Sequence, residues 1–289
     1  MAVDVEMFIK ENEKLLRDFN HFDELYNNWY ADNYILTEFF QKVGIEVQNY
    51  LTTIPKNFIK EYPSGNFDVP NNVIQIASSG FSWVKDLEEV HIGRRVTKIH
   101  SNAFYQCRNL KEIIFKYPGS LQAIGSAAFY GCSSLVEVTL PETLTYIGSY
   151  TFFNCTNLKE INIPDGVKNI FNNTFYRCPN LEKVYLGEGI ESIEHEAFCN
   201  CEKIKNISLP DGLKVIGERA FAGCSGLSKL IIPYSIEIIE SKAFSNCKEI
   251  EFEYSGTKAE WRKIAKTSAF PDTDYICHCT DGDVLKKGN

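Results

Sequence analysis

The chain has 289 residues, of which 44% are hydrophobic and 13% are aromatic, so it can build a sizeable core and is not a disordered segment. Its net charge of −8 argues against binding to the phosphate backbone of a nucleic acid. Residues 1–70 hold twelve Asp and Glu against six Lys and Arg, a net charge of −6, which leaves −2 for residues 71–289. No apolar run approaches the length of about eighteen residues that a membrane span requires, so we expect none.

The first 60 residues have the pattern of two amphipathic helices. Apolar and aromatic residues recur at steps of three and four over residues 4–30, and a second such pattern ends near Leu51. We interpret residues 1–60 as a helical segment that caps the repeats described below or docks another molecule, with self-association as one form of docking. The first ten residues lack a basic stretch followed by an apolar one, which predicts a cytoplasmic protein rather than a virion or cell-surface protein.

Residues 61–250 are dominated by one repeated sequence motif, which is clearest between Ile147 and Leu158. Its phenylalanine recurs every 23 residues, apart from one step of 25, at Phe81, Phe104, Phe129, Phe152, Phe175, Phe198, Phe221 and Phe244. A fixed period of this length is typical of a solenoid, in which each repeat stacks on its neighbours. We therefore expect about eight stacked turns of 23 residues.

Seven of the ten cysteines occupy one position of the repeat, three residues after the phenylalanine. They are Cys107, Cys132, Cys155, Cys178, Cys201, Cys224 and Cys247. Val84 takes this position in the first repeat, so we interpret the thiols as small, buried, reduced apolar groups. A ladder of disulfides between adjacent turns is the alternative.

Residues 251–289 differ from the repeats. Thr257 and Glu260 have the spacing of a capping box, which predicts a short helix, and residues 275–279 read as a strand before a turn at Asp281–Gly282. We interpret this segment as a C-terminal cap made of a helix and strands.

Sequence motifs of catalysis are absent: there is no P-loop, HExxH, GxSxG or paired CxxC. His195, Cys199 and Cys201 lack a fourth ligand for zinc. In residues 277–279, strand alternation places His278 on the opposite face from both thiols. We expect no catalytic residue, no metal site and no cofactor, and hence no enzyme.

The solvent-facing side of the repeat strands is the candidate binding surface. Within each strand, the third and fifth residues should point outward, and these two positions form columns along the stack. The predicted partner-binding residues are Glu89, His91, Glu112, Ile114, Glu137, Thr139, Glu160, Asn162, Lys183, Tyr185, Lys229 and Ile231.

The repeat pattern, as in Leu158 to Leu181, resembles the BspA-like (Treponema-type) leucine-rich repeats. The C-terminal segments Tyr254–Trp261 and Cys279–Gly282 are similar to the C-terminal ends of such proteins in gut bacteria and their phages. The resemblance covers about residues 71–285. It implies an α+β leucine-rich-repeat solenoid, and family members are commonly cell-surface or secreted binding proteins that act in adhesion.

These observations predict a non-catalytic scaffold that binds a protein partner through the strand face. The first hypothesis is an intracellular or phage-encoded binder, for example an inhibitor of a host protein. The alternative is a cell-surface or virion-associated adhesin that binds host or matrix proteins.

Overall fold

The computed structural model describes residues 53–54, 65–69, 71, 73–117, 119–265, 267–270 and 272–286. The two helices expected within residues 1–60 lie outside the described residues. The chain divides into two compact units, Met1–Leu51 and Thr52–Asn289, and the description below concerns the second unit.

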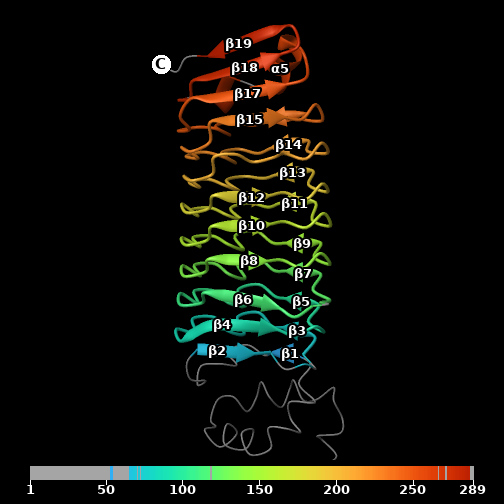
Figure 1. Ribbon diagram of the computed structural model, residues 1–289, viewed down its shortest axis with the longest axis vertical. Coiled ribbons are helices and arrows are strands. Elements are labelled where there is room, and N and C mark those ends of the chain that lie inside the picture. Colours follow the sequence, from blue (N-terminus) through green and yellow to red (C-terminus); the bar gives the residue numbers. More distant parts are fainter. Residues whose placement is uncertain are drawn as a thin grey trace, which may run out of the picture. The chain divides into compact units, whose positions relative to one another are not determined.

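Longer strands, one from nearly every turn, build the main ladder of the solenoid (Figure 1). Its first sheet contains β2 (Gly65–Asp68), β4 (Leu87–Ile92), β6 (Glu112–Phe115), β8 (Glu137–Thr139), β10 (Glu160–Asn162) and β12 (Lys183–Tyr185). All neighbours are parallel, and Val90, Ile113 and Val138 stand in register on adjacent strands. These three side chains are buried, because alternate residues of a strand point to opposite faces.

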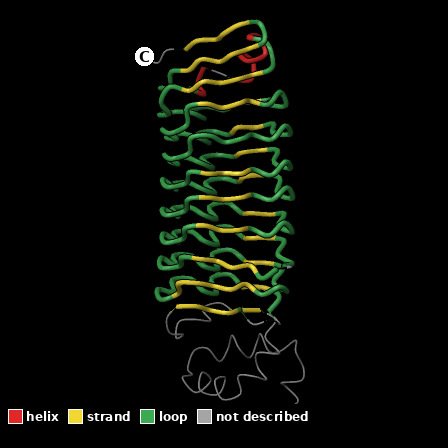
Figure 2. Tube along the Cα trace, viewed as in Figure 1, coloured by secondary structure: helices red, strands yellow, loops and turns green. Residues whose placement is uncertain are grey.

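A second ladder of two-residue strands lies across the core from the first. It contains β1 (Thr53–Ile54), β3 (Gln75–Ile76), β5 (Lys98–Ile99), β7 (Ala123–Ile124) and β9 (Tyr146–Ile147), then β11 (Asn169–Ile170), β13 (Ser192–Ile193), β14 (Val215–Ile216) and β16 (Ile238–Ile239). From β3 onward, each strand ends in the repeated isoleucine, which is buried in every turn. Turns and loops connect the two ladders at each level (Figure 2).

The centre of the solenoid is a stack of phenylalanine rings. Consecutive rings from Phe81 to Phe244 lie 4.6–5.5 Å apart between centroids and within 13° of parallel. Phe270 extends the stack, at 5.4 Å and 4° from Phe244. The solenoid therefore has about nine turns rather than the eight expected, because the last ring comes after an inserted helix that hides its period.

The turn that carries each phenylalanine supplies a third set of hydrogen bonds between levels. In the turn of Phe152, the flanking residues Tyr150 and Asn154 have positive φ angles of 61° and 56°. The backbone N–H groups of Tyr150, Phe152 and Asn154 donate to carbonyl oxygens of the next turn at 2.8–3.0 Å. The left-handed conformation of Tyr150 and Asn154 thus occurs where their N–H groups form hydrogen bonds to the next turn, and these bonds compensate for its cost.

The cysteine position of the repeat is a hydrogen-bond donor as well as a buried group. The Cys155 thiol donates to the Phe129 carbonyl oxygen at 3.3 Å, and the other six cysteines at this position make the same bond to the preceding turn. In the ninth turn, Thr273 takes the position and its hydroxyl donates to the carbonyl oxygen of Phe244. The purely apolar interpretation drawn from Val84 is therefore incomplete. All ten cysteines are free thiols.

The C-terminal end contains the predicted helix and strand. Helix α5 (Lys258–Ile264) starts at Thr257, and both hydrogen bonds of the capping box with Glu260 are present. The second sheet of the main ladder contains β15 (Lys229–Ile232), β17 (Ile250–Tyr254), β18 (Tyr275–Cys279) and the antiparallel β19 (Gly282–Lys286). A 3-10 helix, η2 (Thr267–Ala269), precedes Phe270. Trp261 is fully buried against Phe252 and Phe270 and closes the core at this end.

The main ladder is interrupted between β12 and β15. Residues 206–208 occupy the position that a strand of the main ladder takes in the neighbouring repeats, but they have no strand hydrogen-bond pattern. Ile204 and Ile207 are nevertheless buried, so this turn keeps its contacts with the core. The outward columns predicted from the sequence are consequently divided between two sheets.

Candidate partner-binding surface

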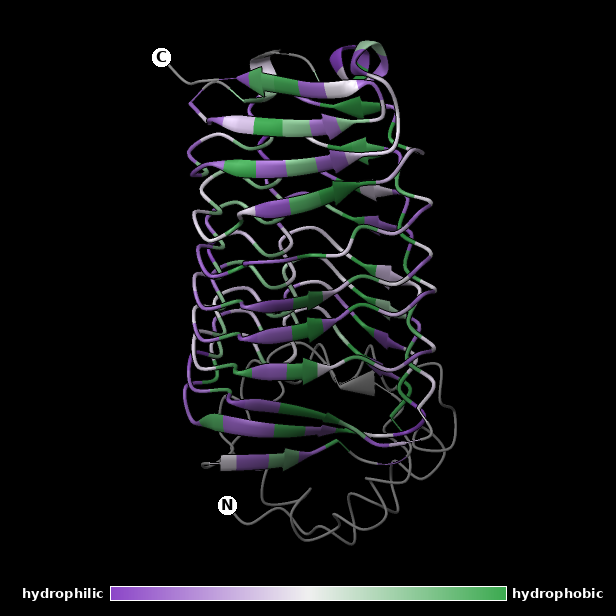
Figure 3. Ribbon diagram, turned by 45° about the horizontal axis from the view of Figure 1, so that its top comes forward, coloured by the Kyte–Doolittle hydropathy of each residue, from purple (hydrophilic) through white to green (hydrophobic). Residues whose placement is uncertain are grey.

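The outward face of the first sheet carries a column of carboxylates. Glu89, Glu112, Glu137 and Glu160 are paired in register on four consecutive strands, β4, β6, β8 and β10. Neighbouring strands lie about 4.8 Å apart, so equal charges follow one another at a distance where they repel. Hydrophilic and hydrophobic residues alternate along β8 and β10, whereas β6 has Glu112 followed by three hydrophobic residues (Figure 3).

Both ends of this acidic column are neutralised by neighbouring side chains. At one end, His91 contacts Glu89 through Nε2 and lies 2.9 Å from Asp68 through Nδ1. Hydrogen bonds to Glu89 and Asp68 raise the pKa of His91, and those from Lys116 and His91 lower the pKa of Asp68. At the other end, Lys183 Nζ lies 3.1 Å from Glu160 Oε2.

The centre of the column has no such compensation. Glu112 and Glu137 are exposed, and within the described part of the chain neither forms an ion pair. Their repulsion weakens the fold slightly, so a cation from outside the chain would be favoured between them. Among the four glutamates of the column, Glu112 and Glu137 are thus the two whose charge no described side chain compensates.

The fifth-position residues form the adjacent column. His91, Ile114, Thr139, Asn162 and Tyr185 follow the predicted line, with in-register pairs from His91 to Ile114 and from Thr139 through Asn162 to Tyr185. Tyr185 is 51% exposed, so its large aromatic ring is accessible to a partner at the edge of the acidic column.

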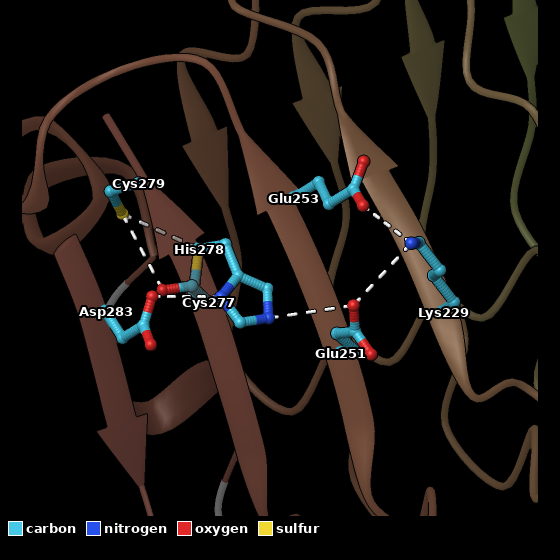
Figure 4. Close-up of polar contacts among 7 residues, drawn as sticks. All are labelled: Lys229, Glu251, Glu253, Cys277, His278, Cys279 and Asp283. Carbon is cyan, nitrogen blue, oxygen red and sulfur yellow. Dashed lines mark hydrogen bonds and ion pairs between the residues drawn. The ribbon is translucent and has the colours of Figure 1, made fainter. Parts of the chain in front are cut away.

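The last two predicted residues belong to the second sheet. Ile231 is 61% exposed on β15, next to Lys229. Lys229 Nζ lies 2.6 Å from Glu253 and 3.5 Å from Glu251, and Glu251 in turn lies 3.6 Å from His278 Nε2 (Figure 4). Lys229 is therefore engaged within its own sheet and separated from the acidic column by the interruption at residues 206–208.

A second surface was not recognised from the sequence. The residue that follows the core phenylalanine is aromatic in four consecutive turns, and these rings stack at 4.5–4.8 Å: Tyr105, Tyr130, Phe153 and Tyr176. Trp83, 57% exposed, contacts Tyr105 edge to face, and the Arg177 guanidinium lies over the Tyr176 ring. Because the rings cover one another's faces, this column presents ring edges to solvent. The available signal was the aromatic residue that follows the core phenylalanine in these four repeats.

His195, Cys199 and Cys201 are the residues that the sequence suggested as possible zinc ligands. Cys199 and Cys201 are buried, and His195 is placed beside Glu196, with Nε2 and Oε2 3.6 Å apart. Among the described residues, no group of three or more His, Cys, Asp or Glu has an arrangement that could hold a metal ion. In the same part of the chain, no helix has the length and apolar character of a membrane span.

A profile of the BspA type leucine-rich repeat region matches residues 52–182 and 122–251, with six copies of the repeat. The chain belongs to this family. No curated protein matches it. A solved leucine-rich repeat protein from Bacteroides ovatus is 23% identical, with a TM-score of 0.53, over 78% of this chain and 70% of that one, and it supports the solenoid fold.

Two further solved structures are similar to this BspA-type chain. A leucine rich cell surface protein from Faecalibacterium prausnitzii is 20% identical over 71% of this chain and 92% of that one, with a TM-score of 0.47. A leucine-rich repeat protein from Eubacterium ventriosum is 30% identical over 69% of this chain and 48% of that one, with a TM-score of 0.47. The BspA-type repeat is a scaffold whose typical role is protein binding.

Proposed function

We propose that this BspA-type protein is a non-catalytic scaffold that binds a protein partner through the outward face of β4 to β12. The observation that carries the proposal is the column of four in-register glutamates whose two central members, Glu112 and Glu137, lack a cation among the described residues. A rigid parallel ladder holds these carboxylates at fixed spacing, and a broad sheet surface is where solenoids usually bind.

The chemistry of the surface indicates a basic partner with apolar residues at its rim. Lys or Arg side chains of the partner would relieve the repulsion at the centre of the column, while the half-buried Ile114 and the exposed Tyr185 offer apolar contact beside it. A large, partly exposed tyrosine next to charges is a typical anchor of protein interfaces. Glu89 and Glu160, already paired within the chain, would mark the two ends of the charged part of the contact.

The test is to reverse the central charges in the full-length chain. Glu112→Lys, Glu137→Lys and Glu160→Lys together should abolish capture of a partner by the tagged protein and leave the melting temperature nearly unchanged. A matched control reverses three exposed glutamates outside the column, Glu142, Glu202 and Glu237, with the same change in net charge. Retention of the same partner by the folded triple variant would overturn the assignment of this face.

The same experiment distinguishes an intracellular or phage-encoded binder from a cell-surface or virion-associated adhesin. A partner captured from host cytosol and lost in the triple variant supports an intracellular or phage-encoded binder, such as an inhibitor of a host protein. Binding to intact cells or matrix proteins, lost in the same variant, supports the adhesin alternative with the same binding face.

A further inference from the structure

Two thiols of strand β18 lie in contact with each other. Cys277 Sγ and Cys279 Sγ are 3.7 Å apart (Figure 4). They share one face of the strand because they are two residues apart. Cys277 is fully buried, whereas Cys279 is half-buried at the end of the strand.

The remaining cysteines differ from this pair in access. The seven at the repeat position are buried, and each donates to a phenylalanine carbonyl oxygen of the preceding turn. Cys199 is also buried. Cys279 is therefore the one cysteine of the ten that solvent reaches appreciably, and its nearest thiol is the buried Cys277.

We propose that Cys277 and Cys279 form a reversible disulfide when they meet a low-molecular-weight disulfide such as glutathione disulfide. The Cys279 thiolate attacks one sulfur of glutathione disulfide, whose S–S bond breaks, and one glutathione leaves as a thiol. Cys277 then loses its proton and attacks the Cys279 sulfur of the mixed disulfide, releasing the second glutathione thiol. Two electrons pass from the protein thiols to glutathione disulfide, and the two protons end on the glutathione thiols.

The backbone permits this bond with a local bend. Residues two apart on a strand have Cα atoms about 6.7 Å apart, which is just inside the upper limit of about 6.8 Å for a disulfide. The strand must still bend, because the two Cβ atoms have to approach to about 3.8 Å. Cys279 is the last residue of β18, and its partner on β19 is Gly282, which has no side chain to obstruct the movement. A bond formed under such constraint is readily reduced again, which suits a reversible site.

Formation of the Cys277–Cys279 disulfide would alter the outward face of the second sheet through His278, which lies between the two cysteines. His278 Nδ1 lies 2.9 Å from Asp283 and His278 Nε2 lies 3.6 Å from Glu251 (Figure 4). Glu251 also contacts Lys229. A bend at His278 must move the imidazole relative to these carboxylates, so the redox state of the thiols would change the charge network of the second sheet.

The reaction should be slow at neutral pH and faster at higher pH. Burial raises the pKa of both thiols, and the charges of Asp281 and Asp283 raise the pKa of Cys279 further, whereas Lys258 lowers it. The pKa of Cys277 is also raised by Cys279 and Asp283. Since the thiolate is the attacking species, its scarcity at neutral pH limits the rate.

The test treats the full-length protein with glutathione disulfide, blocks the remaining thiols by alkylation and maps the peptides by mass. The expected result is a peptide containing both cysteines that is about 2 Da lighter than its reduced form and is not alkylated. Cys277→Ser should stop at a mixed disulfide on Cys279, and Cys279→Ser should not react. A mixed disulfide that persists on Cys279 in the wild-type protein, or no reaction at alkaline pH, would overturn the proposal.

A second readout tests the effect on the outward face. The NMR signals of the His278 ring should shift on oxidation of the wild-type protein and return on reduction, while those of His91 on the first sheet stay in place. Formation of the disulfide without any shift at His278 would refute the coupling to the charge network.

Discussion

His91 lies between two carboxylates, Asp68 and Glu89, on neighbouring strands of the first sheet. Its pKa is raised in the folded state, so its stabilising effect is fully present below the pKa of about 6.5 of an unfolded histidine. The effect is lost as the pH rises through the raised pKa. We expect His91→Asn to lower the melting temperature more at about pH 5.5 than at about pH 8.5.

The contribution of His91 is small because Asp68 is well exposed and solvent screens the pair. A suitable control is His195→Asn, because no comparable bridge between two strands holds that histidine. An equal loss of melting temperature at both pH values would contradict the ion-pair explanation and indicate a packing role for His91.

Substitutions at the cysteine position can distinguish the contribution of packing from that of the thiol hydrogen bond. The Phe129 carbonyl oxygen that accepts the Cys155 thiol also accepts the Cys132 N–H at 3.1 Å, so removal of the thiol leaves no unpaired buried oxygen. We expect Cys155→Val to cost less than about 1 kcal/mol. Cys155→Ala should cost about 1 kcal/mol more than Cys155→Val, because it leaves a cavity beside the phenylalanine stack.

Denaturant unfolding of the two variants checks this order. A valine variant that is less stable than the alanine variant would show that this buried position has no room for a branched side chain, although the half-buried Val84 takes the same place in the first repeat.

The same position shows what the sequence could predict at this scale. Recurrence every 23 residues was sufficient to predict that these cysteines are buried. Their donor role was not visible, because a thiol and a valine have similar size and the acceptor is a backbone atom. Thr273, the polar equivalent, lies 26 residues after Cys247 in sequence, so the inserted helix displaced it from the period.

At the scale of elements, α5 depends on its first turn. Thr257 accepts the Glu260 N–H at 3.3 Å, and the Thr257 N–H donates to Glu260 Oε2 at 2.7 Å. Thr257→Ala removes the capping oxygen and should cost about 1 kcal/mol, whereas Thr257→Ser should be nearly neutral. Hydrogen exchange of the α5 amides measures the effect, and unchanged protection in the alanine variant would contradict it.

The strands show where local pattern is insufficient. Residues 206–208 alternate like the strands before them, and Ile204 and Ile207 are buried as expected. A strand also requires aligned hydrogen bonds with both neighbours, and alignment across turns is not encoded in one segment. The two columns of outward positions are aligned over β4 to β12, but their continuation to Lys229 and Ile231 crosses into a second sheet. That these positions bind a partner stays a prediction.

At the largest scale, the stability of the described solenoid is distributed along the stack of turns rather than concentrated in one compact core. Each turn contacts the turns before and after it, so the free energy of unfolding is close to a sum of terms for single turns and for neighbouring pairs. This property explains how one outward column can carry unfavourable charge repulsion at Glu112 and Glu137. The phenylalanine stack, the second ladder and the turn hydrogen bonds also hold these levels together, away from that face.

The position of a ring in the stack should then decide how the molecule unfolds. Phe152 has stacked neighbours on both sides, at 5.5 Å and 5.4 Å, whereas Phe270 has one stacked neighbour, Phe244. Phe152→Ala should cost about 3–5 kcal/mol and weaken the coupling between the two halves, so thermal unfolding divides into two steps.

Hydrogen exchange resolved by residue provides the measurement. Phe152→Ala should reduce protection in the turns on either side of it and preserve protection toward both ends of the described solenoid. Phe270→Ala, the matched control, should reduce protection near β17 and β18 alone, because its ring contacts Phe244, Phe252 and Tyr275. If Phe152→Ala instead lowered protection equally over all turns in one cooperative transition, the nearest-neighbour description would be wrong, and the stack would have to be treated as a single folding unit.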